Sequence, residues 1–289
     1  MHRRSRLRLV VTLLCCVPAV ATAGERGGGD KSGFHLFNPT PRELLRPLTT
    51  DRPDATESPM TVDAGRVQIE SSLLEYARAS QGGDRERSVA VLATNIKVGL
   101  LDNTDIQFVF TPHQRTRTDA AGSRGRAQGF GDEAQIRLKV NLWGNEGLDA
   151  RFGDTAFAVM PFVKFPTGPT RWRGKRVEGG VILPLAIGMP GDFSLGLMAE
   201  FDLTYDDDRR SYGIDFVHTA TIGHPIVGEL GGYLEYVGIA PRVGRYQPMV
   251  SGGLTYPLAD DSSIDLGARM LISRSARDVT VFAGFSRRF

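Results

Sequence analysis

The chain has very little cysteine. Its two cysteines, Cys15 and Cys16, both lie within the first 23 residues. Residues 1–23 have the pattern of a secretory signal peptide, so we expect both thiols to leave with it. The mature chain would then contain no disulfide, no thiolate metal site and no cysteine nucleophile.

The pattern of this signal is complete. Four arginines precede a short apolar core, Leu9–Val20, and the small residues Ala21-Thr22-Ala23 form the expected cleavage site. A retained anchor is the alternative, but the apolar run is shorter than the roughly 20 residues that span a membrane as a helix. We therefore expect export through a cleaved signal.

Long hydrophobic runs and excess charge of one sign are also missing from the rest of the chain. No later stretch approaches the ~18 apolar residues of a transmembrane helix. Removal of the four signal arginines changes the formal net charge from +2 to −2. Such a charge gives no argument for nucleic acid, and we predict no nucleic-acid partner.

Instead, apolar and polar residues alternate along the chain. In its last twelve residues, Val279, Val281, Ala283, Phe285 and Phe289 share one strand face. A flat, apolar edge strand invites aggregation, whereas a closed barrel pairs its last strand with its first. We assign Phe285 and Phe289 to this barrel-closing strand. It resembles the terminal strand of bacterial outer-membrane barrels, a resemblance that implies recognition by the barrel-assembly machinery.

From residue 65 onward, segments of about ten residues or more alternate with turn residues, which is typical of a membrane barrel. We predict an all-β fold, a transmembrane antiparallel up-and-down β-barrel of about twelve strands. A sandwich or a soluble barrel is the alternative, but strands in sandwiches average about 5–6 residues. The predicted strands are 66–77, 87–99, 104–112, 132–143, 155–165, 177–188, 193–205, 212–223, 228–239, 247–257, 263–272 and 279–289.

Residues 24–64 form a Gly- and Pro-rich extension before the barrel domain, 65–289. Its prolines, which include Pro47, Pro53 and Pro59, exclude a long helix or a central strand. The sequence leaves open whether this segment hangs into the periplasm or enters the lumen as a plug.

Some predicted features of the barrel are irregular. Strands 155–165, 177–188 and 212–223 alternate poorly; Pro161 and Pro184 lie within them, and bulges or local defects would explain the poor alternation. We expect His224–Val227 to be a short periplasmic turn and Thr111–Gln128 to be a long outer connection. The outer connections are rich in arginine, which binds lipopolysaccharide phosphates well, although ordinary solvated charge is the equal alternative.

The polar face of the predicted strands should line the lumen. Both signs of charge occur there, and such a set can build a narrow polar pore or a salt-bridged closure. The lumen candidates are Glu70, Gln135, Arg137, Lys139, Asn141, Glu200, Asp202, Asp265 and Arg269.

We expect no catalytic residues, cofactor or metal. A barrel lipase would need a serine beside a histidine on a strand, and no histidine here is followed two places later by serine. His218 and His224 could share a strand face, but two interface histidines are the stronger interpretation than a metal pair.

Several short motifs resemble one family. They are Asp51-Arg52-Pro53-Asp54, Glu57-Ser58-Pro59, Val67-Gln68-Ile69-Glu70, Gly129-Phe130-Gly131-Asp132, Ile136-Arg137-Leu138-Lys139, Asn141-Leu142-Trp143-Gly144 and Lys164-Phe165-Pro166-Thr167-Gly168. In this order they are similar to the phenol-degradation-pathway (MetA-pathway) transporter family. The resemblance implies an outer-membrane barrel that transports small solutes, aromatic or hydrophobic compounds among them.

The sequence therefore predicts a channel in the cell outer membrane. Its expected partners are outer-membrane lipid, lipopolysaccharide, the assembly machinery and a small-molecule solute. A non-conducting structural or surface-binding barrel is the alternative, and a barrel lipase comes third.

Overall fold

The computed structural model describes residues 30–120, 123–168, 176–273 and 276–289. The expected signal, 1–23, lies outside this part of the chain. Within it, the two helices are single 3₁₀ turns, η1 (Arg42–Leu44) and η2 (Ala150–Phe152). Neither is long and apolar enough to cross a membrane.

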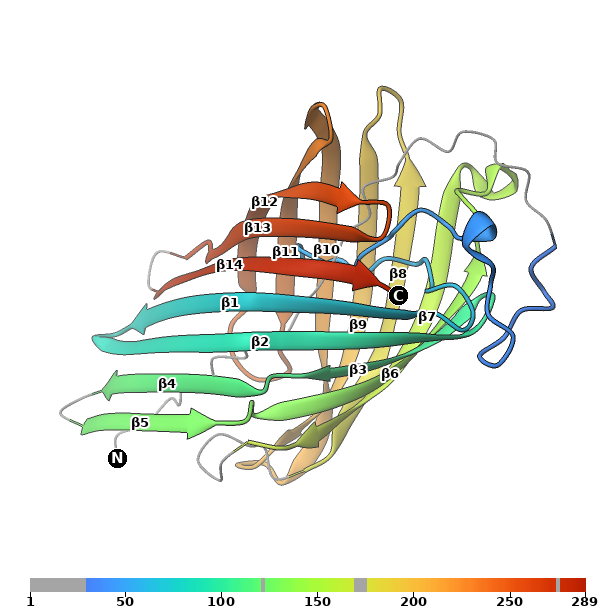
Figure 1. Cartoon of the computed structure of the whole chain (residues 1–289). Coiled ribbons are helices and arrows are strands. Elements are labelled where there is room, and N and C mark those ends of the chain that lie inside the picture. Colours follow the sequence, from blue (N-terminus) through green and yellow to red (C-terminus); the bar gives the residue numbers. More distant parts are fainter. Residues whose placement is uncertain (1–29, 121–122, 169–175, 274–275) are drawn as a thin grey trace.

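The strands form a single antiparallel sheet that closes on itself (Figure 1). The strands are β1 (Val67–Gln81), β2 (Asp84–Leu101), β3 (Thr104–Phe110), β4 (His113–Ala120), β5 (Ser123–Gly129), β6 (Glu133–Trp143), β7 (Thr155–Pro166), β8 (Glu178–Gly188), β9 (Ser194–Asp206), β10 (Ser211–Val227), β11 (Leu230–Ala240), β12 (Gln247–Ala259), β13 (Ser262–Leu271) and β14 (Ala276–Arg288). Because β1 pairs with both β2 and β14, the sheet is a closed barrel, as predicted.

The described strands occupy twelve positions around this barrel. β2 is 18 residues long and pairs with β3 through its second half and with β4 through its first half. β5 pairs with β4 and β6 pairs with β3, so β3 with β4, and β5 with β6, each make one interrupted barrel strand. Twelve positions match the predicted number.

The prediction of a long connection at Thr111–Gln128 was wrong, because this stretch contains the β4–β5 hairpin. The hairpin has no apolar face: arginines alternate with small polar residues such as Thr116 and Thr118. Its pattern is therefore polar on both faces, and hydropathy does not reveal it. Backbone pairing of β4 with the first half of β2 holds the hairpin in the sheet.

The predicted turn at His224–Val227 was also wrong. β10 extends through Val227, with a register shift between Pro225 and Val227, and the turn falls at Gly228 and Glu229. Gly228 adopts a positive φ of 55°, which glycine tolerates without strain. The tight turn therefore forms at the glycine rather than at Pro225.

The bulges expected at Pro161 and Pro184 do not occur. Pro161 pairs with Val181 and Pro184 pairs with Met198, both in continuous register. The strands alternate poorly for another reason: their inward faces are apolar too, as Phe162 and Ile182 show. A strand that is apolar on both faces has no alternation to detect.

Candidate functional site

Residues 46–63 lie against the inward faces of the barrel strands, and we call them the inner segment. Their hydrogen bonds reach β1, β2, β3 and β6 on one side and β10, β11 and β13 on the other. Most of the segment is fully buried; Asp51 and Ala55 are 0% exposed. Figure 1 shows this stretch as the blue chain among the strands.

Asp51 is the centre of a charged cluster. Its carboxylate accepts hydrogen bonds from Lys139 Nζ at 2.8 and 3.0 Å and pairs with Lys97. The Asp51 amide donates to both oxygens of Glu70 at 3.0 Å, and Glu70 also pairs with Lys97 at 2.6 Å. Two buried acids therefore balance two buried lysines, the arrangement that makes buried charge tolerable.

Arg52 binds the neighbouring strands β1 and β13 on either side of β14. Its guanidinium donates to both oxygens of Asp265 on β13, at 3.0 and 2.7 Å, and to Ser72 Oγ at 2.5 Å. It lies flat against Gly284 of β14, where a Cβ atom would come within 2.1 Å of Arg52 Nη2. Glycine at this position gives the bidentate pair the space it needs.

The next residues of the inner segment bind β6 and β11. The Ala55 amide and the Thr56 hydroxyl both donate to Glu235, at 2.8 and 2.9 Å. Glu57 accepts from Arg137 Nη1 at 2.5 Å. The wall thus supplies both an acceptor and a donor to successive residues of one extended segment.

Both ends of the inner segment are fixed at the end of the barrel that carries the β2–β3 turn. Arg46 pairs with Asp63 at 3.1 Å, and Asp63 also accepts from Arg288 Nη1 at 3.2 Å. Arg288 reaches Asp261 in the β12–β13 turn at 2.7 Å. Burial opposes ionisation of Asp261, but the hydrogen bonds and charges of Arg288 and Arg42 outweigh it and lower its pKa.

The other half of the lumen wall carries an apolar cluster. Met160 and Phe162 of β7, Ile182 of β8 and Met198 of β9 are buried inward-facing residues, and they cluster with Ala55 of the inner segment. Val217 and Val237 complete the cluster, with Ile239 and Met249 packed against it. The sequence did not predict this apolar cluster, which lies in the same half of the wall as the predicted charged residues Glu200 and Asp202 of β9, both buried.

The predicted lumen residues take different positions. Those that contact the inner segment are Glu70, Arg137, Lys139, Asn141 and Asp265. Gln135 is buried and accepts from Arg137 at 2.9 Å, and Asp202 pairs with Lys164 at 3.2 Å near the buried Glu200. Arg269 is partly exposed. Their role in passing a solute stays a prediction.

Phe285 and Phe289 lie at the seam. Phe285 pairs with Ser71 of β1, and the Phe289 amide donates to Val67 at 2.8 Å. His218 and His224 do not form a pair: His218 bonds Tyr246 at 3.0 Å, and His224 packs on Phe193 with ring centroids 4.2 Å apart.

Sequence reasoning missed Asp51, Arg52 and Glu57 as partners of the lumen wall. No strand periodicity marks them, because the prolines keep this segment out of the sheet. A signal was present nonetheless: four charged residues, Asp54 included, lie within the seven positions 51–57. Charges so placed in an exported barrel need buried partners if the segment enters the lumen.

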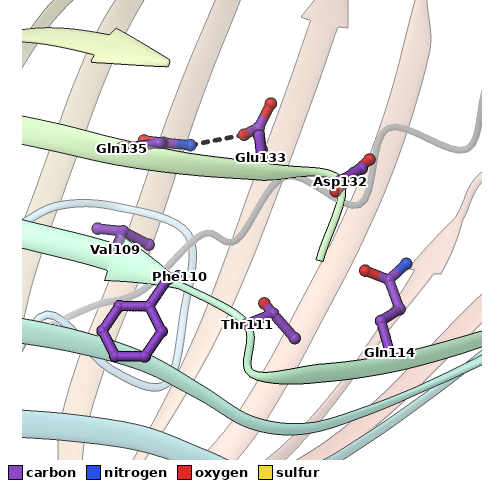
Figure 2. A pocket seen from close by; sticks show the side chains of 7 residues that line it. All are labelled: Val109, Phe110, Thr111, Gln114, Asp132, Glu133 and Gln135. Carbon is purple, nitrogen blue, oxygen red and sulfur yellow. Dashed lines mark hydrogen bonds between the residues drawn. The ribbon is translucent and has the colours of Figure 1, made fainter. Parts of the chain in front are cut away.

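A small polar pocket lies where the wall is interrupted (Figure 2). Figure 2 shows that its lining comes from β3, the start of β4 and the entry to β6. There Gln135 Nε2 donates to Glu133 Oε1 at 2.7 Å. The lining residues are Val109, Phe110, Thr111, Gln114, Asp132, Glu133 and Gln135.

The barrel is similar to solved outer-membrane proteins. The COG4313 outer membrane channel from Pseudomonas putida F1 is 10% identical, with a TM-score of 0.58 over 83% of this chain and 99% of that chain. The NanC porin is 9% identical, with a TM-score of 0.48 over 76% of this chain and 98% of that chain. At these identities the similarity concerns the fold. A search of curated proteins finds no match.

The sequence itself matches a family model. The model, described as "Putative MetA-pathway of phenol degradation", covers residues 50–289. This range includes the barrel and the part of the inner segment that binds its wall. The chain therefore belongs to this family, as its motifs predicted.

Proposed function

We propose that this protein is an outer-membrane channel for small hydrophobic solutes, and that the inner segment closes its lumen at rest. The observation that carries the proposal is the division of the lumen into two walls. Charged side chains of one wall hold Asp51 and Arg52 of the inner segment, and on the other wall an apolar cluster from β7 to β12 packs with Ala55. The family description, which names phenol degradation, agrees with an apolar solute.

The chemistry of the apolar wall supports this solute class. An aromatic or aliphatic molecule that replaces Ala55 against Met160, Met198 and Val237 keeps the apolar surface of these side chains out of water, at about 25 cal/mol per Å². An ion gains less there, because the cluster itself contains only apolar side chains and the adjoining Lys164, whose Nζ lies 5.1 Å from the Phe162 ring centroid, is already paired with Asp202. A hydrophobic solute is therefore the better fit.

The second candidate is a barrel that conducts nothing. The observation in its favour is the number of buried ion pairs that hold the inner segment, with Asp51, Arg52 and Glu57 all bound to the wall. In this case the inner segment is a structural core. The two candidates differ in whether the segment can leave its place.

The test is conductance and solute flux of the refolded mature protein in planar bilayers and liposomes. We expect rare, small openings in the wild type. Asp51→Asn combined with Arg52→Gln should make the openings more frequent and speed phenol flux, since it weakens the attachment to Lys139 and Asp265. Arg42→Gln, an exposed arginine, is the control. Silence of the folded, inserted double variant would establish the non-conducting barrel instead.

A further inference from the structure

Four arginines form one row across four neighbouring strands. Arg78 of β1 pairs in register with Arg87 of β2, Arg87 with Arg117 of β4, and Arg117 with Arg126 of β5. Figure 1 shows β1, β2, β4 and β5 side by side, from blue to light green. We call this set the arginine row.

The arginine row faces outward. All four side chains are exposed, whereas their chain neighbours Ala77, Ala79, Ser88 and Thr116 are buried on the opposite face of the sheet. Strand neighbours point to opposite faces, so the row lies on the outer surface of the barrel. It belongs to the hairpin end, opposite the β2–β3 turn, where longer connections indicate the extracellular side.

The row is electrostatically unfavourable by itself. Residues directly opposite in an antiparallel pair have Cβ atoms about 4.5–5.5 Å apart, and like charges there destabilise the sheet. More arginines surround it, namely Arg85, Arg115 and Arg124. On this face, among the described residues, the one acid within the rows is Asp119, which pairs with Arg124 at 3.5 Å. Such a surface needs anions from outside the chain.

An apolar strip continues directly from the row towards the middle of the barrel. Arg78 is followed on the same outer face by Tyr76 of β1, which pairs with Val89 and Val281. Tyr76, Val279 and Val281 are 38%, 44% and 45% exposed. An amphiphile with an anionic head and apolar tails matches both parts at once, and arginine binds phosphate bidentately.

We propose that the arginine row is a binding site for the phosphate groups of an outer-leaflet glycolipid, with its acyl chains on the adjoining apolar strip. The bound phosphates offset the repulsion between the four guanidinium groups. The site is independent of the lumen, so it stands whether or not the channel conducts.

The test is thermal unfolding of the refolded mature protein with and without lipid A. In a neutral detergent, the triple variant Arg87→Gln/Arg117→Gln/Arg126→Gln should unfold at the wild-type temperature or above it, because it loses like-charge repulsion. Added lipid A should raise the unfolding temperature of the wild type, and the triple variant should lose most of that rise. We expect its apparent lipid A affinity to fall at least about tenfold, as the loss of charge-assisted hydrogen bonds predicts.

A matched triple variant, Arg42→Gln/Arg151→Gln/Arg287→Gln, removes three exposed arginines from the other end of the barrel and should keep the full rise. Dephosphorylated lipid A should give the wild type no rise. An equal rise in both triple variants, or with dephosphorylated lipid A, would overturn the proposal. An equal rise from inorganic phosphate at the same concentration would make the row a general anion site and reject the glycolipid.

Discussion

The two halves of the lumen wall contact the inner segment through different interactions. On β1, β2, β3, β6 and β13, charged side chains bind the inner segment through ion pairs such as Lys139–Asp51 and Arg52–Asp265. On β7 to β11, an apolar cluster that includes Met160, Ile182 and Val237 packs with Ala55, and Glu235 and Thr219 add hydrogen bonds beside it. Ion pairs require one geometry, whereas apolar contact tolerates sliding and exchange. We therefore call the charged half the fixed wall and the half with the apolar cluster the permissive wall.

The largest effect should come from one lysine of the charged wall. Lys139→Met keeps the volume but leaves Asp51 and Glu70 with Lys97 as their single lysine partner. Leaving a buried charge without compensation costs about 3–5 kcal/mol. We expect this loss in the free energy of unfolding by urea titration. A loss below 1 kcal/mol would mean that the inner segment is not held in solution as in this structure.

The permissive wall should respond less, and through volume rather than charge. Met198→Ala removes buried thioether contacts and should cost about 2–3 kcal/mol, whereas Met198→Leu should cost under ~1.5 kcal/mol. The same urea titration separates the two. Equal costs for the two substitutions would mean that packing volume does not govern this wall.

A substitution at Gly284 tests the charged wall alone, since it should disturb only the contacts of Arg52. An added Cβ would collide with the Arg52 guanidinium, so Gly284→Ala should shift the pair with Asp265 at a cost of about 1–3 kcal/mol. Limited proteolysis within residues 46–63 should speed up. Gly125→Ala, whose Cβ would meet nothing closer than 3.9 Å, should leave the cleavage rate unchanged.

The smallest predicted effect is on the stability of the protein at acidic pH. The pKa of Asp261 is lowered in the folded protein, so ionised Asp261 contributes stability above its unfolded pKa of about 3.9, and this is lost as pH falls through the folded value. Below about pH 4, wild type should therefore lose slightly more stability than Asp261→Asn. The site is partly exposed, so we expect the difference in unfolding temperature to be small. A greater acid loss in the variant would contradict the ion pair with Arg288.

Alternation in the sequence revealed the inward face of β6 but not that of β7. On β6, Arg137 and Lys139 alternate with Ile136 and Leu138, so one pattern reveals both the strand and its inward face. On β7, Met160 and Phe162 face inward while Val163 and Phe165 face lipid, and the pattern disappears. Alternation reports a difference between two environments, and lipid and this wall do not differ in polarity.

The inner segment is a different case. Asp51 and Glu57 could be recognised as charges without strand context, but their partners lie 88 and 80 positions away in sequence. No local pattern connects Asp51 to Lys139. Only closure of the barrel brings them together, so this part of the site required the structure.

The pairing of Arg52 with Asp265 and of Asp63 with Arg288 has a consequence for biogenesis. These contacts join the inner segment to the last two strands of the barrel, 213 and 225 positions further on. Contacts of such long sequence separation form late, because the entropy of closing the loop must first be overcome. The inner segment therefore lacks these partners until the final strand has joined the sheet. Pairing of the last strand therefore closes the barrel and also completes the anchoring of the inner segment. A chain truncated before this strand would have an open sheet and an inner segment without these partners.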